Sequence, residues 1–131
     1  MKNIEVVAAI IQKDNKILAT KRGYGEFKNM WEFPGGKIEI GETKDIALKR
    51  EIKEELDADI LIDQFLITVE YTYPNFYLIM HCYLCTLKNG EFNLLEHNEA
   101  RWLELGDLLS VDWLPADIDV IKEIIRIKEN S

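Results

Sequence analysis

The chain has 131 residues, of which 47% are hydrophobic, and this predicts a single domain (residues 1–131) with an ordinary core. Its formal net charge of −8 argues against a nucleic-acid backbone as the main partner, because such partners require a basic surface. No secretory leader begins at Met1, and no apolar run approaches the ~20 residues that cross a membrane. We therefore expect a cytoplasmic protein with no membrane partner.

The N-terminal part of the chain is predicted to form strands that lead into a helix. Two runs of β-branched and other apolar residues flank the turn pair Asp14-Asn15, which predicts a hairpin. A short strand-like piece follows and is cut by Pro34-Gly35-Gly36, and Thr43 is a suitable N-cap for the next helix. The predicted elements are strands at Ile4–Gln12, Lys16–Lys21 and Trp31–Phe33 and a helix at about Thr43–Leu56.

The C-terminal part is predicted to add a second hairpin and a last helix. Two runs rich in β formers are joined through Pro74-Asn75, and Ile118, Ile121 and Ile125 recur at the spacing of one buried helix face. Helices after the third strand and at the C-terminus favour an α/β fold in which helices sandwich a mixed β-sheet. The elements are strands at Ile60–Tyr73, Phe76–Leu87 and Arg101–Leu105, a helical turn at Gly106–Ser110 and a helix from Pro115.

The two cysteines, Cys82 and Cys85, form a C-x-x-C pattern within a predicted strand. An offset of three residues places side chains on opposite faces of a strand, so these thiols are not placed to share a metal ion or a disulfide. We expect two reduced, buried thiols and no zinc site.

The segment from Gly36 to Ala58 carries the strongest functional signal. Because a helix advances about 100° per residue, Glu51, Glu54 and Glu55 share one face, where like charges repel by roughly a few tenths of a kcal/mol per pair. A bound cation reverses the sign of that interaction. A neighbouring apolar stripe provides a face to bury, so we expect the acidic face beside a cleft. The stripe consists of Leu48, Ile52 and Leu56.

This segment resembles the Nudix box, G-x5-E-x7-R-E-U-x-E-E-x-G-U, in which U is a bulky apolar residue. Asp57 stands where the family has glycine, and Asp is one of the few other residues that tolerate a left-handed helix cap. Ala58 at the last position is smaller than usual. Similarity continues in Glu5–Ile10, Trp31–Lys37 and Leu114–Asp117, so it covers nearly the whole chain and indicates the MutT-like branch. The box positions in register are Gly36, Glu42, Arg50, Glu51, Ile52, Glu54 and Glu55.

The resemblance implies both a fold and an activity. The fold is an α/β/α sandwich with a mixed β-sheet. The branch includes enzymes that remove oxidised nucleotides from the nucleotide pool and CTP pyrophosphohydrolases, and its members use Mg²⁺ or Mn²⁺. We therefore expect a Mg²⁺-dependent nucleoside triphosphate pyrophosphohydrolase that releases a nucleoside monophosphate and pyrophosphate. Its expected substrates are cytidine nucleotides or oxidised purine nucleotides such as 8-oxo-dGTP.

The residue chemistry suits such a reaction. Water attack on a triphosphate adds charge to an already anionic site, and hard cations held by oxygen ligands neutralise it. The acidic helix face supplies oxygens, and the carbonyl of Gly35 can complete the set because a glycine turn lets backbone approach closely. One carboxylate must also orient or deprotonate water. The resemblance favours Glu51, itself a candidate ligand, as this base, and Glu54 with Glu55 as the main ligands.

In relatives, a glutamate from a loop outside the box adds a metal ligand or takes over as the base. Glu96 and Glu99, just before Trp102, are the candidates here, and we predict Glu99 as this ligand or base. A solvated loop charge is the alternative. His81 and His97 are interpreted as a strand residue and a loop residue, neither with a metal-ligating partner at suitable spacing.

Three cationic residues are candidates for roles near the phosphates. Arg22 ends a strand and is expected to clamp phosphate, the alternative being a solvated strand-end charge. Lys37 follows the glycine turn into the site. Arg50 is expected to orient Glu51 or to brace the turn rather than to touch the substrate.

Aromatic residues and one carboxylate are candidates for the base pocket. Tyr73 and Phe76 flank a hairpin turn, where they stack either on a base or within the hairpin. Phe33 is a third candidate, although such a residue more often packs in a core. The resemblance puts Asp117 on the base edge, where a carboxylate accepts hydrogen bonds from the amine of cytosine or guanine. A helix-start charge favoured by the macrodipole is the alternative for Asp117.

Two other functions stay open at this point. One is hydrolysis of another nucleoside diphosphate derivative, such as a nucleotide sugar. The other is a catalytically silent Nudix domain that binds nucleotide, against which the intact Glu51, Glu54 and Glu55 count, because binding alone does not require all three. In each case the partner is a small nucleotide, and the chain is expected as a monomer or a homodimer.

Overall fold

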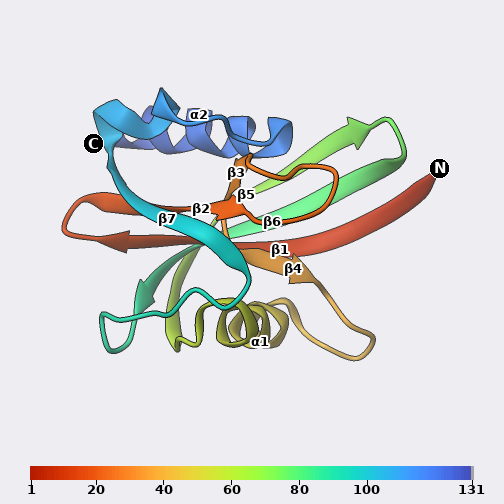
Figure 1. Cartoon of the computed structure of the whole chain (residues 1–131), viewed down its shortest axis with the longest axis horizontal. Helices are drawn as coiled ribbons and strands as arrows, with labels where there is room; N and C mark the ends of the chain where they lie inside the picture. Colours follow the sequence, from red (N-terminus) through yellow and green to blue (C-terminus); the bar gives the residue numbers. More distant parts are fainter. Residues whose placement is uncertain (131) are drawn as a thin grey trace.

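The computed structural model, described here for residues 1–130, has three layers, with a β-sheet between two helices (Figure 1). Helix α1 covers one face of the sheet and α2 covers the other. This arrangement confirms the predicted α/β fold. The elements are β1 (Lys2–Lys13), β2 (Lys16–Arg22), β3 (Trp31–Glu32), β4 (Gly35–Lys37), α1 (Lys44–Leu56), β5 (Ile60–Tyr73), β6 (Phe76–Leu87), β7 (His97–Glu104), the 3₁₀ helix η1 (Leu105–Ser110) and α2 (Pro115–Glu129).

Strand β1 lies at the centre of the mixed sheet. It runs parallel to β6, with Lys2 opposite Phe76 and Ile11 opposite Cys85, and antiparallel to β4 and β2. The predicted hairpins are β1–β2 and β5–β6, and β2 also pairs antiparallel with β3 and β7. Because β1 passes beside both β4 and β6, it brings the glycine segment close to the second hairpin.

Residues 6–11 of strand β1 are apolar without interruption because both faces of the strand are covered there. Successive side chains of a strand point to opposite faces, so Val7 and Ile11 pack toward α1 while Ala8 and Ile10 pack toward α2. The core is therefore divided by the sheet. The α1 core contains Leu48, Ile52 and Leu56 of the predicted helix stripe, and the α2 core contains Ala116, Val120, Ile121 and Ile124.

Both ends of α1 follow from local chemistry. The Thr43 hydroxyl accepts a hydrogen bond from the Ile46 amide at 3.4 Å, as expected of an N-cap. Asp57 adopts the left-handed conformation, with φ 49° and ψ 42°, and its amide donates to the carbonyl of Lys53 at 3.1 Å. Asp57 thus takes the cap conformation predicted for it in place of glycine.

Two segments differ from the sequence-based prediction. Gly35–Lys37 is strand β4 rather than only a turn, because Gly36 and Gly35 pair with Val7 and Ala8 of β1. A side chain at Gly35 would overlap the Val7 carbonyl. Strand β7 begins at His97 rather than at Arg101, because backbone pairing with β2 extends the strand through polar residues.

The two cysteines are free and buried, as predicted. Cys82 packs in the α2 core and Cys85 in the α1 core, which follows from their three-residue offset. Burial raises the pKa of the Cys85 thiol to about 12. Among residues 1–130 there is no helix with the length and apolar character needed to cross a membrane.

Candidate active site

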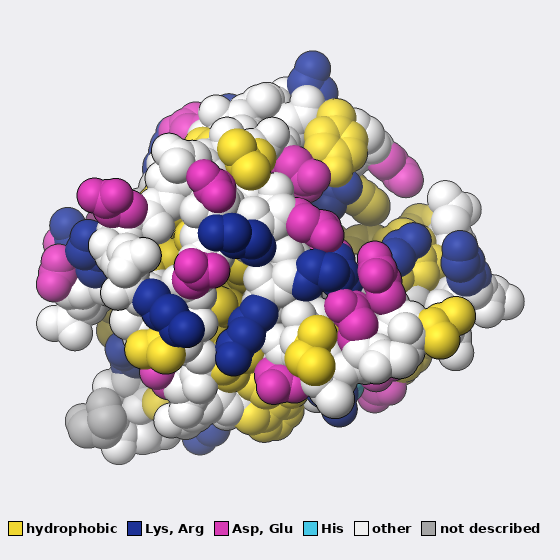
Figure 2. Space-filling view, turned by 90° about the horizontal axis from the view of Figure 1, so that it is seen from below, with side chains coloured by type: hydrophobic (Ala, Val, Ile, Leu, Met, Phe, Trp, Pro, Cys, Tyr) yellow, Lys and Arg dark blue, Asp and Glu magenta, His cyan; other side chains and the backbone are white. Residues whose placement is uncertain are grey.

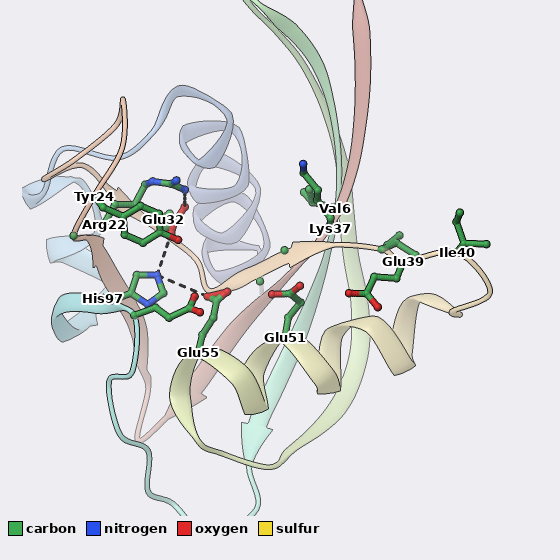
Figure 3. A pocket seen from close by; sticks show the side chains of 15 residues that line it. Val6, Arg22, Tyr24, Glu32, Lys37, Glu39, Ile40, Glu51, Glu55 and His97 are labelled. Carbon is green, nitrogen blue, oxygen red and sulfur yellow. Dashed lines mark hydrogen bonds and ion pairs between the residues drawn. The ribbon is translucent and has the colours of Figure 1, made fainter.

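A cavity of about 960 Å³ lies beside α1, and carboxylates from several elements point into it (Figure 3). We call it the acidic cavity. Glu51 and Glu55, one helical turn apart, enter it from α1, while Gly35 and Gly36 of β4 form its opposite wall. The other residues used below that line it are Arg22, Glu32, Lys37, Glu96 and His97.

Glu55 is the most buried of these carboxylates, with a relative exposure of 5%. Burial raises the pKa of Glu55 to about 9, and the nearby charges of Glu32, Glu51 and Glu96 act in the same direction. Burial also raises the pKa of Glu51, although its hydrogen bond with Arg50 opposes that shift. The cavity therefore concentrates negative charge that a bound cation would stabilise.

Arg50 connects α1 with the glycine segment. Its guanidinium donates to both oxygens of Glu42, with Nε–Oε2 at 2.6 Å and Nη2–Oε1 at 2.8 Å. It also donates from Nη1 to Glu51 at 2.9 Å and from Nη2 to the carbonyl of Lys37 at 3.0 Å. The hydrogen bonds with Glu42 raise the pKa of Arg50 and lower that of Glu42 to about 2. In this geometry Arg50 orients Glu51 and braces β4, without entering the cavity lining.

The glycine wall lies directly against Glu51. A Cβ atom at Gly36 would overlap the carboxyl group of Glu51, so only glycine leaves room for that carboxylate at this place. Glu54 lies differently, since its side chain is half exposed and accepts from Nη1 of Arg50 at 3.3 Å. Glu54 does not belong to the residues that line the acidic cavity.

The structure places Glu99 away from the acidic cavity, contrary to our expectation. Its carboxylate accepts from Arg101 at 2.7 Å and from Lys21 at 3.5 Å, and the bond with Arg101 lowers its pKa. The cause is an irregularity in the pairing of β2 with β7, where Lys21 faces Glu99 but Arg22 faces His97. Adjacent residues of β2 point to opposite faces, so their partners do too.

Glu96 and His97 take the place that we predicted for Glu99. Both line the acidic cavity, and the His97 side chain is 5% exposed. Its Nε2 lies 3.0 Å from Oε2 of Glu32 and 3.8 Å from Oε1 of Glu55 (Figure 3). The interpretation of His97 as a loop residue was wrong, because His97 is the first residue of strand β7. The only signal in the sequence was its position directly after Glu96.

A second cavity of about 340 Å³ adjoins the first. We call it the aromatic cavity. Tyr73 and Phe76 lie parallel in its wall, with ring centroids 4.9 Å apart, and the Tyr73 hydroxyl accepts from the Ala116 amide at 3.2 Å. Burial raises the pKa of Tyr73 to about 12. Phe27, Phe33, Leu78, Met80 and Asp117 also line it.

Asp117 lies at the buried end of the aromatic cavity, with a relative exposure of 4%. Its Oδ1 accepts from the Phe33 amide at 3.4 Å. Burial raises its pKa well above the usual range, and the charge of Glu32 adds to this shift. Asp117 is thus buried in the pocket wall, in the first turn of helix α2.

Arg22 and Glu32 lie at the junction of the two cavities and line both. Nη1 of Arg22 donates to Oε1 of Glu32 at 2.9 Å. Lys37 lines only the acidic cavity and is exposed. The structure therefore brings Arg22, Lys37, Phe33, Tyr73, Phe76 and Asp117 around two connected cavities, as the substrate-binding prediction requires.

The acidic cavity suits a hard divalent cation. Carboxylate groups predominate among the possible ligands in its lining, and carboxylate oxygens match Mg²⁺ or Mn²⁺ rather than softer metals. The raised pKa of Glu55 marks a carboxyl group that lacks a compensating charge. Within residues 1–130 no three such side chains already converge in a closed ligand cluster, so the carboxylates and any waters would complete the coordination on binding.

The outer face of α1 has a different character. Figure 2 shows this side of the molecule, where Lys and Arg side chains lie among Asp and Glu. Lys44, Lys49 and Lys53 of α1 are exposed, whereas Glu51 and Glu55 turn inward. The helix therefore separates a solvated face of mixed charge from an acidic face directed into the cavity.

Comparison with known proteins agrees with this site. Residues 1–124 match the NUDIX domain family. A CTP pyrophosphohydrolase of Escherichia coli strain K12 is 31% identical over 129 residues, covering 98% of this chain and 96% of that protein. An 8-oxo-dGTP diphosphatase of the same strain is 32% identical over 129 residues, covering 97% of this chain and 100% of that protein. The solution structure of the E. coli ORF135 protein has a TM-score of 0.84 and 30% identity, covering 98% and 92% of the two chains.

The α/β/α fold places a carboxylate-lined cavity beside α1. The chain belongs to the Nudix family, in its MutT-like branch. It is accordingly a hydrolase of phosphorus anhydrides, and hydrolases of this family generally use divalent cations.

Proposed function

We propose that the protein is a Mg²⁺-dependent nucleoside triphosphate pyrophosphohydrolase that converts its substrate to a nucleoside monophosphate and pyrophosphate. The observation that carries this proposal is the pair of adjoining cavities, one acidic and one aromatic, which share Arg22, Glu32, Gly35 and Gly36. A nucleotide has the same division into an anionic part and a flat, largely apolar part.

The acidic cavity receives the phosphates in this proposal. A divalent cation there supplies charge neutralisation and lowers the pKa of bound water. Glu55 and Glu51 are the ligand carboxylates from inside the cavity, with Glu54 and the Gly35 carbonyl at its edge. Glu51 is also the proposed base that orients water, because Arg50 and the wall at Gly36 fix its carboxylate.

Glu96 supplies the carboxylate from outside the helix in this assignment, since it lines the cavity and Glu99 does not. Arg22 and Lys37 are the cations for the phosphates. Arg22 must exchange or share its hydrogen bond with Glu32 to do so.

The aromatic cavity receives the base. Tyr73, Phe76 and Phe33 offer ring faces, and Asp117 is the polar group at the buried end. A carboxyl group at this place hydrogen-bonds an amine-bearing base edge, which favours cytosine or an oxidised guanine over thymine. The preferred substrates are therefore cytidine nucleotides or oxidised purine nucleotides such as 8-oxo-dGTP, and two of the relatives above carry these activities in their names.

A nucleotide panel with Mg²⁺ tests the proposal. CTP, dCTP, UTP, dGTP, 8-oxo-dGTP, a nucleotide sugar and ADP-ribose are each incubated with the enzyme, and the products are identified by ³¹P NMR. We expect monophosphate and pyrophosphate from CTP or 8-oxo-dGTP. Orthophosphate with a nucleoside diphosphate would contradict the proposed position of cleavage. Preferential cleavage of the sugar derivative or ADP-ribose would instead identify the alternative diphosphate hydrolase, and binding without turnover would identify a silent domain.

A further inference from the structure

His97 occupies a central place among the carboxylates of the acidic cavity. Its Nε2 lies between Oε2 of Glu32, at 3.0 Å, and Oε1 of Glu55, at 3.8 Å (Figure 3). The Glu32 carboxylate is an acceptor, so its hydrogen bond with His97 requires the hydrogen on Nε2. In the part of the chain that the structure describes, Nδ1 is buried and has no hydrogen-bond partner.

The backbone holds this ring in place. Strand pairing puts His97 opposite Arg22, and the irregularity before Glu99 keeps the imidazole on the cavity side of the sheet. Oε1 of Glu32 accepts a hydrogen bond from Nη1 of Arg22 at 2.9 Å, and Oε2 of Glu32 accepts one from Nε2 of His97 at 3.0 Å. A continuous series of polar contacts thus leads from Arg22, at the junction with the aromatic cavity, to Glu55.

The carboxylates need such a support. Glu55 is almost fully buried, and once it is ionised to bind a cation it repels Glu32. His97 donates to Glu32 at 3.0 Å and lies 3.8 Å from Glu55, so the ring restricts the side-chain positions of both carboxyl groups. Groups that orient metal-binding carboxylates in this way typically contribute about 10–100-fold to metal affinity or activity.

We propose that His97 is a positioning residue: its Nε2–H group hydrogen-bonds Glu32, and its ring, whose Nε2 lies 3.8 Å from Oε1 of Glu55, keeps Glu55 in its metal-binding orientation. The proposal rests on the proposed function only in taking Glu55 as a ligand of a divalent cation. It assigns His97 no contact with the substrate.

Metal binding without nucleotide gives a direct test. Mn²⁺ is titrated into metal-free wild-type protein and the variants His97→Phe and His97→Gln by calorimetry and electron paramagnetic resonance. Phenylalanine fills the space without a donor, whereas the glutamine amide keeps an N–H near the position of Nε2. His81→Phe is the matched control, because His81 also binds a glutamate, Glu5 at 2.6 Å, but lies outside the cavity lining.

We expect His97→Phe to weaken Mn²⁺ binding by about 10–100-fold, the usual effect of losing an orienting group. His97→Gln should recover most of the affinity, and His81→Phe should leave it unchanged. Circular dichroism and thermal unfolding establish that each variant is folded. Wild-type Mn²⁺ affinity in folded His97→Phe, or equal losses in the Phe and Gln variants, would overturn the proposal.

A second measurement needs no variant and serves if His97→Phe does not fold. Long-range ¹⁵N–¹H spectra of metal-free wild-type protein identify the protonated nitrogen of each histidine. Hydrogen on Nε2 of His97 supports the proposal, and a neutral ring with hydrogen on Nδ1 overturns it. If Mn²⁺ affinity depends on His97 as expected but the wild-type protein does not cleave triphosphates, the proposed function is contradicted and this inference stands.

Discussion

The acidic and aromatic cavities adjoin each other but are assembled in different ways. Most of the acidic cavity's chemistry comes from one helix and the glycine segment before it, at Glu51, Glu55 and Gly35–Lys37. The aromatic cavity takes Phe33, Tyr73, Phe76 and Asp117 from four separate places in the chain. The first is organised by helical periodicity, and the second by packing between elements distant in sequence.

This difference separates two kinds of function. The relative positions of residues one helical turn apart are fixed by the helix itself. We therefore expect the chemistry of the acidic cavity to be independent of which nucleobase the substrate carries. The aromatic cavity depends on how the second hairpin and α2 meet, and it changes with any substitution at that junction. We therefore expect substitutions in the acidic cavity to lower all activities and those in the aromatic cavity to change the ratio between substrates.

The largest effect is expected from Glu55→Gln. This change keeps the shape of the side chain but removes a metal-binding charge, so kcat should fall by roughly 100-fold or more with every nucleotide. The exposed Glu104→Gln is the control. Wild-type turnover of a folded Glu55→Gln protein in both saturating and limiting Mg²⁺ would remove Glu55 from the metal site.

Gly36→Ala tests whether the glycine wall sets the position of Glu51. The added methyl group overlaps the Glu51 carboxyl, and a shift of about 1 Å in a reacting group can cost about 100-fold in rate. We expect kcat to fall by about 10–100-fold for all substrates, in steady-state assays. Gly106→Ala, where a methyl group meets open space, should have no effect. Equal rates in the two variants would show that Glu51 tolerates displacement.

Asp117→Asn tests the other cavity. The change keeps one acceptor and adds a donor, so kcat/KM for an amine-bearing base should fall by about 1–3 kcal/mol, the value of one good base contact. Substrates with a carbonyl at that edge should lose less or gain. The measurement is kcat/KM for CTP, dCTP, UTP, dGTP and 8-oxo-dGTP with both proteins. An unchanged ranking would leave base selection to Tyr73, Phe76 or other residues.

Glu96 and Glu99 allow a comparison of neighbouring carboxylates. Glu96 lines the acidic cavity, whereas Glu99 is paired with Lys21 and Arg101 outside it. We expect Glu96→Gln to lower kcat by about 10-fold or more, as for other groups at a metal site, and Glu99→Gln to have little effect. Parallel kinetics at several Mg²⁺ concentrations decide between them. The reverse result would restore the assignment of Glu99.

The smallest effect concerns stability in the absence of metal. The pKa of Glu55 is raised to about 9 in the folded protein, so the folded state takes up a proton at this group. The contribution of Glu55 to stability is complete at pH values below about 4.5, which is its pKa in the unfolded chain. This contribution is lost as the pH rises toward about 9, the pKa of Glu55 in the folded protein. Relative to wild type, Glu55→Gln should therefore gain stability over this range, measured by urea unfolding with chelator. A difference independent of pH would contradict the raised pKa.

Local patterns in the sequence were sufficient to predict helix α1 and both of its caps. The offsets between Glu51, Glu54 and Glu55, the N-cap at Thr43 and the left-handed cap at Asp57 depend on backbone geometry within a few residues. The same holds for the opposite faces of Cys82 and Cys85 and for both hairpins. Such features do not require knowledge of where the rest of the chain lies.

Only the tertiary structure decided which residues outside the helix reach the cavities. His97 and Glu99 are two residues apart, so on a regular strand their side chains would lie on the same face. The irregular pairing of β7 with β2 places them on opposite faces instead. Likewise, the Phe33 amide meets Asp117 across 84 positions of sequence. Hydrogen bonds and packing between distant segments set these positions, and local periodicity carries no information about them.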